Sequence, residues 1–244
     1  MRLFTLLMIL PCALSARDPD PVLREARRYA RGWLDGLDDI VCRQEVEHFS
    51  AGGSHAWRPD GRTLSELTFH RGVEHYALLG ADGQPRPAAR PAGKVTLDSR
   101  GEFGTAVWML FDPASNATFQ RGGTKDRDGR HLRRYDFKVP KKNSQWEIGA
   151  DGYTPAYFGN ILVDEADGSL HWLEMEALQF PSSSLFMAVR LRLIFSTVDI
   201  DGLPHVLPES AEVRICTRQC MCQQRKFAFS QYRHFTATSK LITP

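Results

Sequence analysis

The sequence lacks the signatures of several enzyme classes and of nucleic-acid-binding proteins. It contains no Gly-x-Ser-x-Gly nucleophile elbow, no phosphate-cradling glycine-rich loop and no paired-histidine helix of the metalloprotease type. Its 31 Lys and Arg residues nearly balance its 29 Asp and Glu residues, so the formal net charge is only +2. That balance argues against a nucleic-acid-binding protein, which usually concentrates basic residues on one face.

Long hydrophobic runs are also missing, except at the N-terminus. Arg2 precedes an apolar run at residues 3–14, and the small residues that follow offer a cleavage site. This pattern is typical of a signal peptide, because a bilayer span needs about 20 apolar residues. Pro11 before Cys12 does not fit a lipoprotein signal. We predict a leader at residues 1–16, one domain at residues 17–244, a periplasmic or secreted location and no transmembrane segment in the mature chain.

Cysteines are few, and their placement suggests oxidation. Without Cys12 the chain keeps Cys42, Cys216, Cys220 and Cys222, and an even count in an oxidising compartment favours disulfides. In a final hairpin Cys216 can lie opposite Cys222 or opposite Cys220, and Cys42 can take the remaining thiol. The three closely spaced cysteines also allow a metal site. Their spacing is not that of a zinc knuckle, however, and no histidine lies near, so we expect disulfides and neither a metal nor a cofactor.

What the sequence does contain is a ladder of alternating apolar and polar residues from about Leu132 to Tyr232. Alternation with a period of two marks half-buried β-strands. One register pairs two of them on both faces, because Leu173 falls opposite Leu193 and Glu174 opposite Arg192. In the second strand, one face is predicted to hold Met187, Val189, Leu191, Leu193 and Phe195. Earlier strands are expected at residues 40–49, 63–70, 73–79, 118–121, 132–139 and 145–150.

The strands on either side of this pair follow from their turns. A turn at residues 166–168 allows Ile161 to lie opposite Leu173. Asp201 and Gly202 form a strong tight-turn signal. A two-residue turn alone would place Leu193 opposite Ser210, however, and would break the apolar face. We therefore predict a three-residue loop or a β-bulge, aided by Pro204 or Pro208.

Two helices are expected. Asp20 and Pro21 form a helix start, with Asp as N-cap and Pro at the first position, and Gly36 lies near the end of the apolar helical spacing that follows. Residues 80–93 read as a surface loop. A short apolar helix is expected at residues 103–111, ended by Asp112 and Pro113. Such a helix must be covered, so we place it on the concave side of a curled sheet.

Acidic residues suggest no catalytic centre. Glu174 and Glu176 share a face, as a glycosidase pair would, but the arginines opposite them would lower the pKa of each carboxyl. Asp164, Glu165 and Asp167 have the chemistry of a weak calcium site, although turns commonly hold such residues. We predict no catalytic residue and no metal ligand.

Four segments carry a resemblance to a known family: residues 101–104, 110–114, 207–213 and 229–237. They resemble exported proteins of soil bacteria of the acidobacterial type, which are distantly similar to outer-membrane lipoprotein-sorting (LolA- and LolB-like) proteins. The resemblance implies a curled antiparallel half-barrel whose concave face holds acyl chains. The cysteine-rich turn is not a feature of that family.

The predicted fold is mainly β (α+β), a half-barrel of about 10–11 strands with an N-terminal helix and a short apolar helix on its concave side. The function that this fold suggests is non-enzymatic binding of a lipid or a lipoprotein acyl chain. The alternatives are an envelope structural or interaction protein with a filled core, which would have an envelope protein as partner, and a hydrolase built from scattered polar residues. The predicted ligand-binding face comprises Phe103, Val107, Leu110, Ile148, Leu173, Met175, Val189, Leu191, Leu193 and Phe227.

The leader gives the first testable prediction. We expect the exported protein to begin near Ser15 or Ala16, because the charged start, the apolar run and the small residues together form a cleavable signal. N-terminal sequencing of the protein recovered after export measures this directly. A mature protein that begins at Met1 would contradict it.

Overall fold

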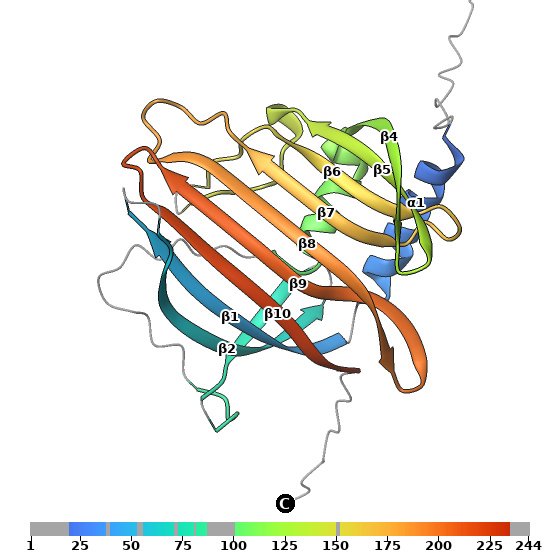
Figure 1. Cartoon of the computed structure of the whole chain (residues 1–244), viewed down its shortest axis with the longest axis horizontal. Coiled ribbons are helices and arrows are strands. Elements are labelled where there is room, and N and C mark those ends of the chain that lie inside the picture. Colours follow the sequence, from blue (N-terminus) through green and yellow to red (C-terminus); the bar gives the residue numbers. More distant parts are fainter. Residues whose placement is uncertain are drawn as a thin grey trace, which may run out of the picture.

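The structure, a computed structural model, describes residues 20–37, 40–52, 56–70, 73–80, 82–86, 101–149 and 152–234. The predicted leader lies outside these residues. One antiparallel sheet of ten strands dominates the fold, in the order β3-β2-β1-β10-β9-β8-β7-β6-β5-β4 (Figure 1). The strands are β1 (Ile40–Ala51), β2 (Arg58–His70), β3 (Val73–Leu78), β4 (Thr118–Arg127), β5 (Arg130–Val139), β6 (Tyr157–Asp164), β7 (Leu170–Ala177), β8 (Phe186–Ile200), β9 (Leu203–Thr217) and β10 (Cys222–His234).

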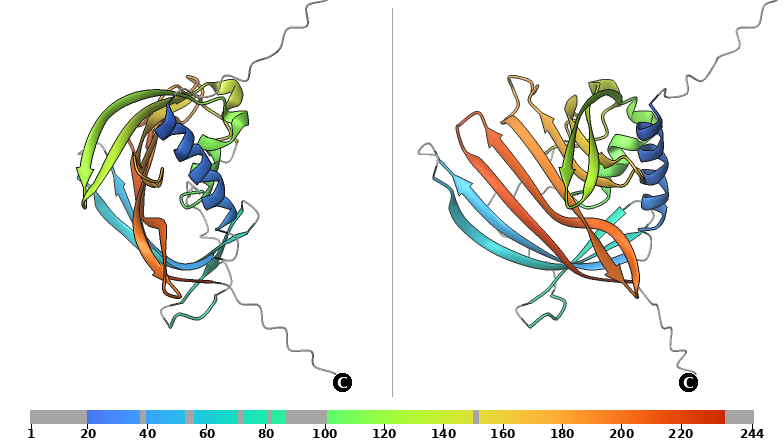
Figure 2. Two further views of the ribbon diagram at one scale, coloured as in Figure 1. Left: turned by 90° about the vertical axis from the view of Figure 1, so that its right-hand side faces the viewer. Right: turned by 45° about the vertical axis from the view of Figure 1, so that its right-hand side comes forward.

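The sheet is curled and not closed, because β3 and β4 remain its two edges. The last strand, β10, lies between β1 and β9 and so joins the two ends of the chain. The helices α1 (Pro21–Asp35) and α2 (Thr105–Phe111) lie in the hollow of the sheet (Figure 2). Two short 3₁₀ turns, η1 (Pro113–Ser115) and η2 (Lys141–Asn143), lie beside β4 and β5 in the chain. The predicted fold class is therefore confirmed.

The strand expected at residues 145–150 is wrong. Within the described part of that segment only Ile148 makes a β-bridge, to Tyr153. Gly149 adopts a left-handed φ of 76°, which turns the chain back on itself. Both edges of the preceding strand β5 are already taken, by β4 on one side and by β6 on the other, so the segment cannot fold back to pair with it.

The predicted central register is confirmed. Leu173 pairs with Leu193, Glu174 with Arg192 and Glu176 with Arg190. The Arg190 guanidinium donates to the Glu176 carboxylate over 2.8 Å, so the charges pair across the outer face as expected. On the other side of β7, Ile161 lies opposite Leu173. One apolar face therefore runs without interruption across β6, β7 and β8.

The turn at Asp201 and Gly202 is a two-residue turn, and the predicted bulge corrects the phase behind it. Ile194 pairs with Ser210 but Phe195 pairs with Pro208, so β9 holds one extra residue at this point. The bulge places Leu193 opposite Ala211 and keeps both in the core. Pro208 lacks an N–H and fits such an irregular position.

Met187 does not lie on the apolar face, contrary to the prediction. The pairing of β8 with β9 shifts between Phe186 and Ala188, which leaves Met187 as an extra residue. A bulge redirects the local side chains, and Met187 is 47 % exposed at the end of the sheet.

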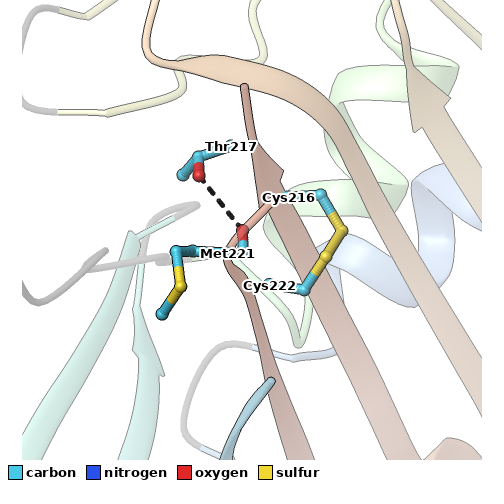
Figure 3. Close-up of a disulfide and its surroundings, with 4 residues drawn as sticks. All are labelled: Cys216, Thr217, Met221 and Cys222. Atoms are coloured by element: carbon cyan, nitrogen blue, oxygen red, sulfur yellow. Dashed lines mark hydrogen bonds between the residues drawn. A yellow bond between two sulfur atoms is a disulfide. The ribbon is translucent and has the colours of Figure 1, made fainter. Parts of the chain in front are cut away.

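One of the predicted disulfides is present, between Cys216 and Cys222, which pair across β9 and β10 (Figure 3). Cys42 and Cys220 are free, so the predicted role of Cys42 as the partner of a remaining thiol is wrong. The strand register explains why Cys42 is not a partner: Ala51, at the end of β1, lies opposite Cys222, whereas Cys42 lies near the start of β1. At about 3.3 Å per residue Cys42 is roughly 30 Å from the hairpin tip, far beyond disulfide range.

The predicted helix ends are confirmed. The Asp20 side chain accepts hydrogen bonds from the N–H groups of Val22 and Leu23, over 3.0 and 3.4 Å, and Gly36 follows the last turn of α1. Leu23, Ala26 and Ala30 bury one stripe of the helix. The short helix α2 ends before Asp112 as predicted but starts at Thr105, two residues later than expected, and five of its seven residues are buried.

The hairpin disulfide gives a stability prediction. Replacing Cys216 and Cys222 together by Ala should lower the free energy of unfolding by about 2 kcal/mol, because a short covalent loop is lost. Denaturant unfolding measures this, with Cys220→Ser as a control of unchanged stability. Thiol titration of the denatured, unreduced mature protein should find only Cys42 and Cys220 reactive, and four reactive thiols would contradict the disulfide.

Candidate functional site

The structure brings the predicted ligand-binding face together as the core of the molecule. Its ten residues are each no more than 6 % exposed and belong to one apolar cluster. Seven come from the sheet or the adjoining loop, and Phe103, Val107 and Leu110 come from α2 and the turn before it. In this structure α1 and α2 cover the face (Figure 2). A ligand on that face would therefore have to lie between the sheet and the helices.

The start of α2 is held by one carboxylate from the edge strand β3. Glu74 Oε1 accepts hydrogen bonds from the backbone N–H groups of Phe103, Gly104 and Thr105 at 3.2, 2.9 and 3.0 Å. It also accepts one from the Thr105 hydroxyl at 3.0 Å, and Glu74 Oε2 accepts one from Tyr76. Four donors thus depend on a single oxygen, which ties the helix to the sheet edge.

Sequence reasoning missed Glu74. It lies about 30 residues before the helix it caps, on a strand at the edge of the sheet, and no local spacing links the two. Gly104 completes the junction, because an added Cβ would lie 2.6 Å from the Phe69 ring. The resemblance segment at residues 101–104 thus includes this close approach of helix and sheet.

Side chains of β6 and β10 also hold α2 and the turn before it. The Tyr157 hydroxyl donates to the Met109 carbonyl at 3.0 Å, and burial raises the pKa of Tyr157, so it stays a donor. Phe103 packs against Phe229 and Tyr232 of β10 with ring centroids 5.3 and 6.1 Å apart. Contacts therefore hold α2 from both halves of the half-barrel.

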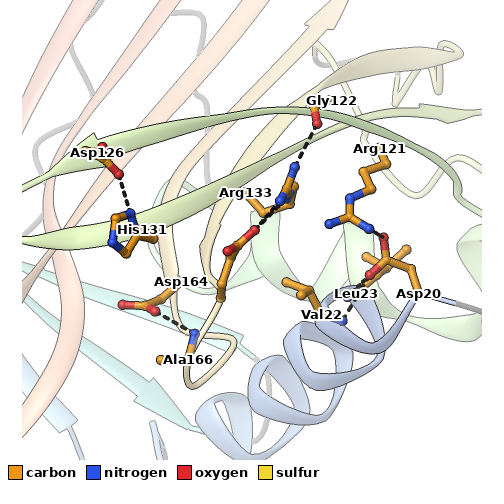
Figure 4. A network of polar contacts seen from close by, with 11 residues as sticks. Asp20, Val22, Leu23, Arg121, Gly122, Asp126, His131, Arg133, Asp164 and Ala166 are labelled. Atoms are coloured by element: carbon orange, nitrogen blue, oxygen red, sulfur yellow. Dashed lines mark hydrogen bonds and ion pairs between the residues drawn. The ribbon is translucent and has the colours of Figure 1, made fainter.

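The helix α1 is attached by polar contacts at its start (Figure 4). Asp20 caps the helix and also lies 3.7 Å from the Arg121 guanidinium of β4. The turn after β6 packs closely on the same helix. Gly168 of this turn has a φ of 73° and lies so close to α1 that an added Cβ would be only 2.7 Å from the Glu25 backbone.

The carboxylates of the acidic turn beside α1 are paired with arginines of β5. Asp164 accepts from Arg130 over 2.8 Å, and Glu165 accepts from Arg133 over 2.7 Å. Asp167 lies 3.6 Å from Arg130. Burial opposes ionisation of Asp164, but the Ala166 N–H and Arg130 outweigh it and lower the pKa of that carboxyl. Among the described residues no group of three or more His, Cys, Asp or Glu side chains is arranged to hold a metal ion.

A groove of about 480 Å³ opens between α1 and the distal part of the β8–β9 hairpin. Its floor is apolar, because Leu37, Ile40 and Leu207 are buried there. Trp33 forms one wall, donates its indole N–H to the Val206 carbonyl over 2.6 Å and packs edge-on against Phe195 at 5.9 Å. The groove therefore borders the apolar core of the sheet.

The upper part of the groove is polar. Arg28 and Arg130 line it, but Glu25, Asp164 and Asp167 already pair with them. Burial, assisted by Asp167 and opposed by Arg130, raises the pKa of Tyr29 to about 12, so its hydroxyl is neutral at physiological pH. His205 Nε2 is buried and has no hydrogen-bond partner among the described residues. The groove was not foreseen, because it forms between segments far apart in the sequence.

Two further grooves lie elsewhere. One, of about 490 Å³, lies beside β1, β2 and β10 and is lined by the paired Arg233 and Glu66. The other, of about 540 Å³, lies on the outer face over β4 to β7 and is lined by polar residues together with Leu162 and Trp172. Neither contains a residue of the predicted ligand-binding face. Within the described ranges, moreover, neither α1 nor α2 has the length and hydropathy to cross a bilayer.

The sequence matches no known family model, and no curated protein matches it at a significant level. The structure is similar to those of lipoprotein-sorting proteins, as the sequence resemblance predicted, and also to that of the lipoprotein LppX. A LolA superfamily protein from Nitrosomonas europaea is 11 % identical, with a TM-score of 0.42, over 89 % of this chain and 97 % of that one. A domain named for outer membrane lipoprotein sorting, from Vibrio parahaemolyticus, is 14 % identical, with a TM-score of 0.43, over 88 % and 93 %. Lipoprotein LppX of Mycobacterium tuberculosis is 12 % identical, with a TM-score of 0.30, over 90 % and 100 %.

The Glu74 cap gives the third prediction. Replacing Glu74 by Ala should destabilise the protein by about 1–3 kcal/mol, because partly buried donors lose their acceptor. Hydrogen exchange at the amides of residues 103–111 should accelerate more than elsewhere. The control is Glu47→Ala, an exposed glutamate on β1. Equal exchange in the two variants would contradict the role of Glu74.

Proposed function

We propose that the protein binds an apolar ligand, a lipid or a lipoprotein acyl chain, between its curled sheet and its helices. The observation that carries the proposal is the groove beside α1, whose buried floor borders the apolar face of the sheet. Its volume of about 480 Å³ falls within the range of about 300–1,000 Å³ that is usual for small-molecule sites.

The ligand is proposed to enter along this groove and to reach the face lined by Leu191, Leu193 and their neighbours as α1 gives way. Trp33 lies at the junction, because it contacts Phe195, which is next along the apolar face of β8 after Leu193. Each methylene that leaves water contributes about 0.8 kcal/mol. A long chain can thereby offset the contacts that α1 loses when it moves.

We propose an exported, non-enzymatic role, in the periplasm or secreted. The hairpin disulfide supports export, because such bonds persist in oxidising compartments. Against a hydrolase, the carboxylates once considered as a catalytic pair are bound by arginines: Glu174 by Arg192 and Glu176 by Arg190. The sequence resemblance implies the same class of ligand.

An envelope structural or interaction protein is the second candidate, and one observation favours it. The entire predicted ligand-binding face is buried within the protein's own core. A face that is already filled offers an acyl chain nothing unless the helices move. The two functions thus differ in whether a ligand can displace the covering of the sheet.

Gly32 offers a test that leaves the core intact. It lines the groove on the exposed side of α1, and an added Cβ would meet nothing within 4 Å. Gly32→Trp should fill the groove and abolish uptake of a fluorescent long-chain fatty acid. Gly32→Ala is the matched control, since it stabilises the helix by about 1 kcal/mol but leaves the groove open. An Asp at Leu191 would be a poorer test, because it buries a charge in the core.

The outcomes separate the candidates. Uptake by the natural protein and by Gly32→Ala, with loss in Gly32→Trp, supports the proposal. Equal uptake by all three would place the ligand elsewhere and overturn the route along α1. No uptake, together with no lipid found by mass spectrometry of the protein purified from its native envelope, would favour the structural role.

A further inference from the structure

A group of exposed apolar side chains lies at the end of the sheet remote from the α1 groove. Leu178, Leu185, Met187 and Met221 are each between 43 % and 48 % exposed. We call these four residues the rim patch. They come from the loop between β7 and β8, from the start of β8 and from the turn between β9 and β10, at the upper left of Figure 1. Large apolar side chains gathered at one exposed place are typical of an interaction surface.

Hydrogen bonds of Arg218 and the nearby disulfide hold together the loops that carry the rim patch. Arg218 donates to the carbonyls of Ser184, Phe180 and Pro181 at 3.0, 3.1 and 3.0 Å, and its backbone N–H donates to the Leu185 carbonyl at 3.0 Å. The Cys216–Cys222 disulfide closes the turn that bears Met221 (Figure 3). The patch is thus presented by a braced support.

Positive charge adjoins the patch. Lys141 lies over the Tyr153 ring at 4.8 Å, and the Tyr153 hydroxyl donates to the Gln179 carbonyl at 3.4 Å, within the same loop as Leu178. Lys142, the next residue, is exposed, and Arg218 contacts the same loop at Phe180 and Pro181. Glu147 is the exposed acid nearby in the chain. Apolar tips flanked by cations are the chemistry of a protein surface that meets anionic lipid headgroups.

We propose that the rim patch docks the protein reversibly on an anionic phospholipid surface, with the four apolar side chains in the interface and the two lysines at the headgroups. A second copy of the chain is the weaker candidate, because face-to-face pairing would bring Lys141, Lys142 and Arg218 of both copies together. The inference does not rest on the ligand proposed above. Docking by this end leaves the α1 groove, at the other end of the β8–β9 hairpin, directed away from the lipid.

Vesicle sedimentation tests the proposal, with the protein recovered after export and its N-terminus verified. Every protein carries Cys220→Ser, so that no disulfide between copies can contribute. Vesicles of phosphatidylcholine alone are compared with vesicles that also contain phosphatidylglycerol. The apolar variant combines Leu178→Ser, Leu185→Ser and Met221→Ser, and the charge variant combines Lys141→Glu and Lys142→Glu.

Matched controls lie away from the rim. Leu203→Ser and Val73→Ser remove exposed apolar side chains, 62 % and 53 % exposed, and Leu203 lies at the opposite end of the β8–β9 hairpin. Lys125→Glu with Arg31→Glu makes the same change in net charge on exposed residues of β4 and α1. Circular dichroism and unfolding curves confirm that each variant is folded.

We expect the protein without rim substitutions to bind the anionic vesicles, and we expect the control variants to bind them equally well. Each rim variant should lower the partition coefficient at least about tenfold, since each lysine near such a surface adds substantially to binding. Equal binding by rim variants and controls would overturn the proposal. So would absence of binding by the unmodified protein, and a rim-dependent dimer seen by light scattering would assign the patch to a second copy.

Discussion

The fold depends on covering the apolar face of an open sheet. Leu, Ile, Val, Phe and Met side chains line the inner face of the ten-stranded sheet, and the sheet does not close on itself. A closed barrel would bury such a face by its own curvature. Here two helices do it instead, and neither is long. The stability of the sheet therefore depends on the placement of the two helices.

The helices are held by polar contacts at their ends and by packing along their length. Glu74 ties the start of α2 to an edge strand, and Asp20 ties the start of α1 to β4. The hydrogen bonds to the Glu74 carboxylate are worth only about 1–3 kcal/mol each, and the half-exposed ion pair of Asp20 with Arg121 is worth less because water screens it. A ligand that buries several methylenes gains as much. Under the proposed function, a cover attached in this way is secure without a ligand and yields when one binds, which the wall of a closed barrel would not do.

Much of the fold could be predicted from the sequence, because the central strands satisfy two faces at once. Leu173 against Leu193 and Glu174 against Arg192 allow a single register, and a one-residue slip would fail on both faces. The bulge near Pro208 followed from the same demand. The sequence allowed Cys216 to pair with either Cys220 or Cys222, and only the structure identifies Cys222 as its partner.

The rest depended on tertiary contacts that no local pattern encodes. Glu74 and α2 are joined across a long separation, and the groove at Trp33 exists only when α1 lies on the β8–β9 hairpin. Met187 was placed on the wrong face because the sequence alternation continues past it, whereas the β-bulge at Met187 interrupts the alternation of side chains between the two faces. The segment at residues 145–149 alternates like a strand, but both edges of the preceding strand β5 are already paired.

The two ends of the half-barrel differ in what they leave exposed, and the difference follows from how each is closed. At one end α1 lies across the sheet, and its contact with β8 and β9 leaves a groove with a buried apolar floor. At the other end no helix intervenes between the described loops and solvent, and Arg218 and the Cys216–Cys222 disulfide brace those loops instead. Bracing of this kind fixes the backbone without burying the side chains. Leu178, Leu185 and Met221 therefore remain exposed to water, which is unfavourable for apolar groups and is not needed to hold the loops. A scaffold alone would be as stable with polar residues at those three positions. Their apolar character is therefore better explained by a surface that meets them than by the fold.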